Sequence, residues 1–220
     1  MEDQSGATAA VTPDVTVITP AYNAMPYIRR TLQSLVDQTI GHDRMEVVVV
    51  DDGSSDGTGE ELDRWSQDYP GLFRIVHQEA SGGPAGPRNV ALDMARGRFV
   101  FFLDADDYLG EESLARLVAM ADENDSDVVL GKMVGLGGRG VAQSMFRKSV
   151  ADADLFRSRV WWTLSVLKLY RRSLIEENAL RFPTEFRTTS DQPFAGLAYL
   201  RARKISVEAD YDHYYVVRPH

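Results

Sequence analysis

Phe102-Leu103-Asp104-Ala105-Asp106-Asp107 is the stretch that decides the fold of this sequence. It ends a run of large apolar side chains, from Phe99 to Leu103, with three carboxylates in four positions. An apolar run of this length that stops at polar residues predicts a strand buried on both faces of a sheet. Carboxylates at the carboxyl end of such a strand lie at the edge where open α/β sheets bind their ligands.

Asp104 and Asp106 are two positions apart, so on an extended backbone their side chains point the same way. Hard divalent cations prefer oxygen ligands, so this pair predicts a Mg²⁺ or Mn²⁺ site. The alternative is an acidic turn in which Asp107 caps the following helix. The metal site is favoured because similar polar loops follow other predicted strands.

Strand-like and helix-like segments alternate along the first 130 residues. The predicted strands are 15–19, 45–50, 73–76, 99–103 and 128–130. The predicted helices begin at Pro26, after the loop 51–58, at Asn89 after a Gly/Pro loop, and at Glu111. Repeated β-α units favour right-handed crossovers, which predicts an α/β fold with a mostly parallel central sheet flanked by helices. Because three of the strands end in polar loops, we expect a nucleotide site at a topological switch point.

The pattern is weaker after Gly131. Four glycines within residues 135–140 predict a mobile loop or hairpin tip. Residues 161–170 are apolar and aromatic, 191–202 predict a helix, and 211–217 predict a strand.

The composition fits one α/β domain, since 220 residues with 44% hydrophobic side chains can build a sizeable core. A net charge of −9 argues against a nucleic-acid partner, which needs a basic face. The same charge makes an anionic ligand dependent on a metal ion or a local arginine. The absence of cysteine excludes disulfides and thiolate metal sites.

Residues 1–14 are small and polar, and we expect a disordered leader there, followed by one domain over 15–220. No apolar stretch approaches the roughly 18 residues that indicate a membrane span. We therefore expect a cytoplasmic protein, and an acceptor at the inner face of the membrane is compatible with this.

Four motifs occur in order along the chain. They are Thr19-Pro20-Ala21-Tyr22-Asn23, Val50-Asp51-Asp52-Gly53-Ser54-Ser55-Asp56-Gly57-Thr58, Arg88-Asn89 and Phe102-Leu103-Asp104-Ala105-Asp106-Asp107. In this order they resemble the GT-A glycosyltransferases of family 2, inverting enzymes that use nucleotide-diphosphate sugars. The resemblance is strong over 15–130 and looser over 160–218. It implies a nucleotide-sugar-binding half at 15–130 and an acceptor half at 131–220.

The resemblance implies a base and ribose pocket lined by Pro20, Ala21, Tyr22 and Asn23. In the same way Asp51 or Asp52 would accept a hydrogen bond from the base imide, which distinguishes uracil from cytosine. The alternative for this second loop is a turn with helix capping.

Arg88 matches the family's arginine that faces the diphosphate, for which a planar guanidinium is well suited. The alternative is an exposed arginine at a helix start. The chain departs from the family pattern before Arg88, with Ser81 in place of the usual Asn and two prolines in the loop. Nucleotide contacts from residues 80–83 are therefore not carried over.

The Asp104-Ala105-Asp106 stretch corresponds to the family's metal-binding Asp-x-Asp. By resemblance Asp106 would ligate Mn²⁺ or Mg²⁺, and Asp104 would touch the ribose or a metal-bound water. His213 matches a late histidine that completes the metal shell in several relatives. The alternative for His213 is a packed strand residue.

Asp191 corresponds to the family's catalytic base, the Asp of a Glu-Asp pair at a helix start, with Ser190 replacing the Glu. Pro193 fixes the first turn of that helix. The alternative is that Asp191 only caps the helix. Glu185 is the nearest other late carboxylate, and no helix start holds it.

The resemblance thus implies transfer of a sugar from a UDP-sugar to a hydroxyl acceptor with inversion. Residues 161–194 are loosely similar to the enzymes that glycosylate wall teichoic acid, so a glycan or polyol-phosphate acceptor is expected. Those enzymes carry further C-terminal domains for acceptor binding or oligomerisation, and we expect this chain to be a catalytic domain of a longer protein. A nucleotidyltransferase and a non-catalytic nucleotide-sugar-binding scaffold are the competing hypotheses.

Overall fold

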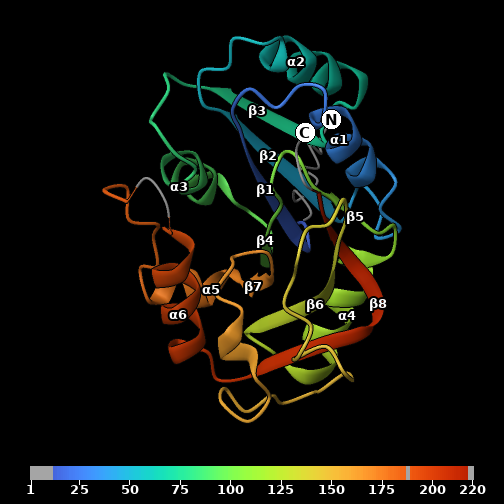
Figure 1. The fold of residues 1–220 in the computed structure, drawn as a ribbon. Coiled ribbons are helices and arrows are strands. Elements are labelled where there is room, and N and C mark those ends of the chain that lie inside the picture. The colour runs from blue at the N-terminus through green and yellow to red at the C-terminus, as the bar shows by residue number, and fades with distance from the viewer. Residues whose placement is uncertain (1–11, 187–188, 218–220) are drawn as a thin grey trace, which may run out of the picture.

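The computed structural model describes residues 12–186 and 189–217, which form one eight-stranded sheet with helices on both faces (Figure 1). The strands are β1 (Val15–Ala21), β2 (Met45–Asp51), β3 (Phe73–His77), β4 (Phe99–Phe102), β5 (Tyr108–Leu109), β6 (Val128–Gly135), β7 (Leu169–Arg171) and β8 (Ile205–Val216). The helices are α1 (Ile28–Val36), α2 (Thr58–Asp68), α3 (Ala85–Met94), α4 (Ser113–Asn124), the 3₁₀ helix η1 (Val160–Trp162), α5 (Arg172–Glu177) and α6 (Asp191–Arg201). Within the described ranges no helix combines the length and the apolar character needed to cross a membrane.

The strand order β3-β2-β1-β4-β7-β6-β8-β5 divides the sheet into two parts. Strands β3, β2, β1 and β4 are all parallel, as the repeated β-α units predict. At the centre β7 pairs with β4 antiparallel, and beyond it β6 and β8 are parallel while β5 is antiparallel to β8. The α/β fold is therefore confirmed, with a parallel half and a mixed half.

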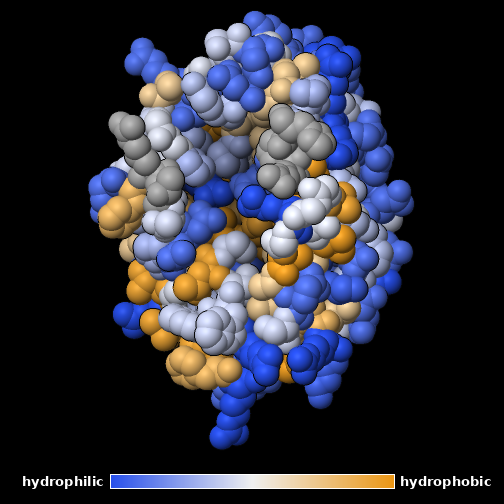
Figure 2. Space-filling model, viewed as in Figure 1, coloured by the Kyte–Doolittle hydropathy of each residue, from blue (hydrophilic) through white to orange (hydrophobic). Residues whose placement is uncertain are grey.

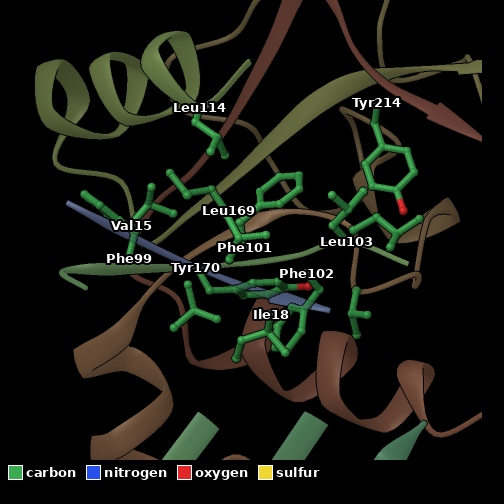
Figure 3. Packing of buried hydrophobic residues seen from close by; sticks show 14 of the residues in the cluster. Val15, Ile18, Phe99, Phe101, Phe102, Leu103, Leu114, Leu169, Tyr170 and Tyr214 are labelled. Carbon is green, nitrogen blue, oxygen red and sulfur yellow. The ribbon is translucent and has the colours of Figure 1, made fainter. Parts of the chain in front are cut away.

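Side chains of β4 alternate between the two layers of the core. Phe101 lies with Leu169 of β7 on the side of Leu114 from α4, whereas Phe102 lies with Tyr170 on the other side (Figure 3). Phe102 packs edge-on against Tyr170, Phe182 and Phe194, with ring centroids 5.8, 5.3 and 5.5 Å apart. This aromatic cluster joins β4 to β7 and α6, so it holds the two parts of the sheet together.

Helix α3 begins at Ala85, four residues before the expected start at Asn89. The two prolines that suggested a loop are compatible with this, because the first turn of a helix has no backbone partner for its N–H groups. Pro84 is the N-cap, and the Arg88 N–H donates to the Pro84 carbonyl at 3.1 Å. Arg88 is therefore fixed within a helix and does not end a flexible loop.

Two other boundaries also differ from expectation. Strand β6 runs to Gly135, well past the expected end at Leu130, because β8 pairs with it along its whole length. At the N-terminus Pro13 is buried, its carbonyl accepts from the Arg98 N–H at 3.0 Å, and Asp14 forms ion pairs with Arg44 and Arg98. Residues 1–11 of the expected leader lie outside the described residues.

Candidate active site at the carboxyl edge of the sheet

The loops that follow β1, β2 and β4 meet at one edge of the sheet, as the three polar strand ends predict. The Asp52 N–H donates to the Ala21 carbonyl at 2.8 Å, which joins the first two loops. Thr31 of α1 donates to the carbonyls of Ala105 and Asp107 at 2.9 and 2.6 Å, which joins the third. Figure 2 shows a hollow near the middle of the face viewed in Figure 1, with mostly hydrophilic residues around it.

One pocket at this edge, here called the tyrosine pocket, has a volume of about 330 Å³. Its lining residues are Tyr22, Asp52, Ala80, Gly82, Gly83, Pro84 and Pro87. Tyr22 is 60% exposed, so its ring is available to a ligand. Gly53 has a φ of 77°, and a Cβ there would lie 2.8 Å from the Ala80 nitrogen, so the close approach of these two loops requires glycine.

Asp52 is held in the tyrosine pocket by two neighbours. Gln78 Nε2 donates to Asp52 Oδ1 at 2.6 Å. Ser81 donates from its backbone N–H to Oδ1 at 2.9 Å and from its hydroxyl to Oδ2 at 3.0 Å. The serine that departs from the family pattern therefore fixes the carboxylate that faces this pocket.

Asp51 is turned the other way, toward His77 at the end of β3. Its Oδ2 lies 3.0 Å from His77 Nδ1, and His77 Nε2 lies 3.0 Å from Asp63 of α2. Hydrogen bonds to Asp51 and Asp63 raise the pKa of His77, because both carboxylates favour the imidazolium. Of the two aspartates expected near the base, only Asp52 lines the pocket.

The rest of the first loop supports the pocket from behind. Asn23 has a left-handed φ of 46°, its N–H donates to Ser54 Oγ at 2.9 Å, and its Oδ1 accepts from the Ser55 N–H at 2.8 Å. Ala21 is 1% exposed, while Pro20 is partly exposed. Neither Pro20, Ala21 nor Asn23 is among the lining residues, so their contact with a nucleoside remains a prediction.

A second pocket, here called the aspartate pocket, adjoins the first through Pro84 and has a volume of about 440 Å³. Its lining residues are Pro84, Arg88, Asp104, Leu164, Ser165, Thr189, Ser190, Asp191 and Gln192. It thus brings together three of the predicted site residues, Arg88, Asp104 and Asp191, from three separate elements of the chain.

Arg88 joins the two carboxylates of this pocket. Its Nη1 donates to Asp191 Oδ1 at 2.6 Å and its Nη2 donates to Asp104 Oδ1 at 2.8 Å. The guanidinium is 3% exposed and lies 5.3 Å from the centroid of the Phe182 ring. The alternative of an exposed arginine at a helix start is therefore wrong, since Arg88 is buried and engaged by two acids, while its expected contact with a diphosphate remains a prediction.

Asp191 is the first residue of α6, and its carboxylate bonds to Arg88. Helix α6 has no side-chain cap hydrogen bond, so the capping interpretation is not what the structure shows. Phe194, one turn later, is fully buried and stacks on Phe182 at 4.2 Å, which fixes the start of the helix. A carboxylate at a helix amino terminus is also favoured by the helix dipole.

Residues 104–107 form a turn in which the Asp107 N–H donates to the Asp104 carbonyl at 3.1 Å. The extended backbone expected for the acidic pair is therefore wrong. Burial and the negative charge of Asp104 raise the pKa of Asp106. Asp107 does not cap α4: its carboxylate accepts from the Tyr214 hydroxyl at 2.9 Å and the Val217 N–H at 2.7 Å, and burial raises its pKa to about 7.

His213 does not reach the acidic turn. Side chains alternate along β8, and because Tyr214 reaches Asp104 and Asp107, its neighbour His213 faces the opposite layer. There the imidazole is buried, and its Nε2 bonds to Glu208. Burial lowers the pKa of His213 to about 3. The structure thus places His213 as a packed strand residue bonded to Glu208, an arrangement that favours the alternative interpretation and gives its expected role as a metal ligand no support.

Comparison with known proteins decides the family. Residues 16–181 match the model of the glycosyl transferase family 2, which is more than half of the chain. The chain belongs to glycosyltransferase family 2. It is 42% identical over 204 residues to a poly(ribitol-phosphate) beta-glucosyltransferase from Bacillus spizizenii, which covers 93% of this chain and 32% of that protein. The chain therefore spans about a third of the length of this relative and of TarS from Staphylococcus aureus, to which it is 43% identical over 203 residues.

Solved structures of the family confirm the GT-A fold. TarS 1-349 of Staphylococcus aureus in complex with UDP-GlcNAc matches with a TM-score of 0.90 and 42% identity, over 94% of this chain and 59% of that one. A mannosyltransferase from Pyrobaculum calidifontis in complex with GDP-Man and Mn²⁺ matches with a TM-score of 0.66 and 26% identity, over 90% and 57%.

For a family 2 chain, the acidic turn fits a divalent cation in part. Asp104 and Asp106 provide oxygen ligands, and repulsion between them is what a cation relieves. Across residues 12–186 and 189–217, no three His, Cys, Asp or Glu side chains are placed to share one ion. Because Mg²⁺ and its analogues are often held by one or two carboxylates and substrate phosphates, this donor set suits an ion that arrives with a nucleotide.

Sequence reasoning missed the residues that position the family site. Ser81 and Gln78 hold Asp52, and the Tyr214 hydroxyl accepts from the Asp104 N–H at 3.1 Å. The signal for Ser81 was its place in the Gly/Pro loop. Tyr214 stood beside His213, in a segment whose strand alternation the sequence left undetermined.

Proposed function

We propose that this chain is the catalytic domain of an inverting glycosyltransferase that moves a glucosyl or N-acetylglucosaminyl group from a UDP-sugar to a hydroxyl of a poly(ribitol phosphate) chain. The observation that carries the proposal is the pair of adjoining pockets. One presents an aromatic ring and a fixed carboxylate, and the other presents a carboxylate beside an acidic turn. Two relatives at 42–43% identity are named as a poly(ribitol-phosphate) beta-glucosyltransferase and a poly(ribitol-phosphate) beta-N-acetylglucosaminyltransferase.

The tyrosine pocket is proposed to hold the uridine. Tyr22 offers a ring face on which a base can stack, and Asp52 offers an oriented acceptor for the uracil N–H. Cytosine has no N–H at the equivalent ring position, so the carboxylate favours uracil.

The diphosphate is proposed to lie between the two pockets, next to the acidic turn. A divalent cation bound by Asp106 would neutralise negative charge on the departing nucleotide. The chain's own contribution there is the placement of two carboxylates on a tight turn, tied to α1 by Thr31 and to β8 by Tyr214. Arg88 holds Asp104 in place from the side of α3.

Asp191 is proposed as the general base. Its carboxylate takes the proton of the acceptor hydroxyl as that oxygen forms a bond to the anomeric carbon. The bond from the same carbon to the diphosphate oxygen breaks, and UDP leaves with the electron pair. Because attack and departure occur on opposite faces of the carbon, the configuration inverts. Arg88 fixes the orientation of the Asp191 carboxylate through its bond to Oδ1.

The test begins with donor binding. We expect UDP-glucose or UDP-GlcNAc to raise the melting temperature, more so with Mn²⁺, while GDP-mannose should have little effect. The donor that binds is then incubated with poly(ribitol phosphate), and release of UDP and incorporation of sugar are measured. A chain that binds neither UDP-sugar, or that binds one and transfers nothing to the polymer in the full-length protein, contradicts the proposal.

A further inference from the structure

Lys168, directly before β7, is a buried cation to which the mechanism above assigns no role. Its side chain is 2% exposed. Its Nζ donates to the Ser165 carbonyl, lies 3.5 Å from Ser165 Oγ and is 5.6 Å from the centroid of the Tyr199 ring. Within the described part of the chain no carboxylate lies within ion-pairing distance of it, unlike the other buried cation, Arg88.

The contacts of Lys168 place it behind one wall of the aspartate pocket. Leu164 and Ser165 line that pocket together with Asp191. Residues 163–165 are held from behind at two points, because Lys168 bonds to the Ser165 carbonyl and the Tyr199 hydroxyl donates to the Thr163 carbonyl at 2.9 Å. Tyr199 belongs to α6, the helix that begins with Asp191. The same helix therefore holds residues 163–165 and positions the Asp191 carboxylate.

A structural role alone does not explain why this residue is a lysine. A neutral donor could satisfy the Ser165 carbonyl, whereas an unpaired ammonium costs several kcal/mol to bury. Burial lowers the pKa of Lys168 to about 7, and the negative charge of Asp191 opposes that shift. The charged groups that face this region are therefore Asp191 from α6 and, through Asp191, Arg88 from α3. When it is protonated, Lys168 therefore adds a positive charge to the electrostatic environment of Asp191, the carboxylate that the proposed reaction uses.

We propose that Lys168 is a positioning residue of the transfer reaction, which fixes the 163–165 wall where the acceptor hydroxyl enters and places a positive charge behind Asp191. This inference rests on the proposed function for the role of Asp191. It concerns the acceptor side of the site only. The tyrosine pocket shares no lining residue with this wall, so donor binding should not depend on Lys168.

Three substitutions separate the two parts of this role. Lys168→Met removes both the hydrogen bond and the charge, Lys168→Gln keeps an N–H donor without the charge, and Tyr199→Phe removes the other bond to the wall. Lys204→Met is the matched control, because Lys204 also donates to a backbone carbonyl, that of Asn124, at 2.7 Å and is not a lining residue of either pocket.

For Lys168→Met we expect kcat/KM for poly(ribitol phosphate) to fall on the order of 10–100-fold, as for a small misplacement of reacting groups. UDP affinity should stay unchanged. Hydrogen exchange at residues 163–167 should become faster in Lys168→Met and Tyr199→Phe and stay slow in Lys204→Met. The acid limb of the pH–rate profile should move to higher pH in Lys168→Met and Lys168→Gln and stay in place in Tyr199→Phe.

Wild-type exchange and wild-type transfer in Lys168→Met would overturn the proposal, and so would an equal loss in Lys204→Met. If Lys168→Met does not fold, Lys168→Gln decides the role of the charge and Tyr199→Phe decides the role of the wall. If the wild-type protein itself transfers no sugar, the proposed function fails. Hydrogen exchange then still decides whether Lys168 holds the wall, since it requires no substrate.

Discussion

At the scale of single residues, the site depends on one guanidinium shared by two carboxylates. Arg88 is buried, and Asp104 and Asp191 are 36% and 30% exposed on the pocket side. Removal of one charged partner from a buried ion pair leaves the remaining charge unpaired. The stability lost in this way is larger than the net stability that the intact ion pair contributes. Arg88→Ala should therefore lower the stability of the fold, because the Asp104 and Asp191 carboxylates would lose the cation that they share.

Asp191→Asn should abolish sugar transfer while UDP binding is kept. The amide cannot take the acceptor proton, and loss of a general base costs on the order of 10²–10⁴ in rate. Transfer and UDP affinity are measured on the same preparation. Asp93→Asn serves as control, since it removes the carboxylate of an exposed ion pair with Arg181 at 2.8 Å. Near-normal transfer by Asp191→Asn would show that another group is the base.

Asp106→Asn should remove the effect of Mn²⁺ on UDP affinity without a loss of stability in metal-free buffer. The reason is that burial and Asp104 both disfavour the charge of Asp106, so a neutral amide relieves repulsion. Calorimetry with and without Mn²⁺ measures the first effect, and thermal unfolding in EDTA measures the second. A variant that keeps its metal response would exclude Asp106 as a ligand.

At the scale of elements, the sequence predicts best where local pattern and tertiary environment agree. Strands β1, β2 and β4 are mostly apolar or β-branched and almost entirely buried because both faces are covered, so sequence pattern and context give the same result. The start of α3 was misplaced because two prolines resemble a loop, although a first turn accepts them. The face of the sheet to which His213 points could not be predicted from the sequence. Strand alternation allows either face, and only the packing of the neighbouring layer determines which one is used.

His77 connects β2, β3 and α2 through Asp51 and Asp63, so its protonation should contribute to the stability of that region. Its pKa in the fold is raised above the ordinary value of 6.5, so the contribution is complete below that value and is lost as pH rises through the folded pKa. His77→Gln should therefore lower the melting temperature more at about pH 6 than at about pH 9.

His42→Gln is the control for the loss of an imidazole as such, because the hydrogen bond of His42 Nε2 goes to a backbone carbonyl, that of Val36, at 2.9 Å and not to a carboxylate. An equal loss at both pH values in His77→Gln would mean that the imidazole packs there without its charge contributing.

At the scale of the whole molecule, the proposed nucleotide side and the proposed acceptor side share one continuous sheet. The junction is β4, which pairs with β1 on one edge and with β7 on the other. The aspartate pocket draws on both sides of this junction, because it takes Arg88 and Asp104 from one side and Asp191 from the other. The geometry of the proposed reaction therefore requires that the two sides do not move apart.

This architecture predicts that the chain unfolds as one unit. Phe194 of α6 packs against Phe102, Tyr170 and Phe182 across the junction, and it is fully buried. Phe194→Ala should cost about 3–5 kcal/mol of stability, as for other buried aromatic truncations. Since the aromatic cluster joins both sides, the loss should lower the protection of slowly exchanging amides in β1 and β2 as much as in β6 and β8.

Calorimetry should show a single transition for the wild type and for Phe194→Ala, with equal calorimetric and van't Hoff enthalpies. Leu197→Ala is the control, because Leu197 lies on the same helix with 47% exposure and should change stability little. If β1 and β2 keep their protection while β6 and β8 lose theirs, the two sides are separate folding units. In that case the contact between Arg88 and Asp191 is made by docking of two preformed parts, and Asp191 would be positioned by that docking instead of by a common core.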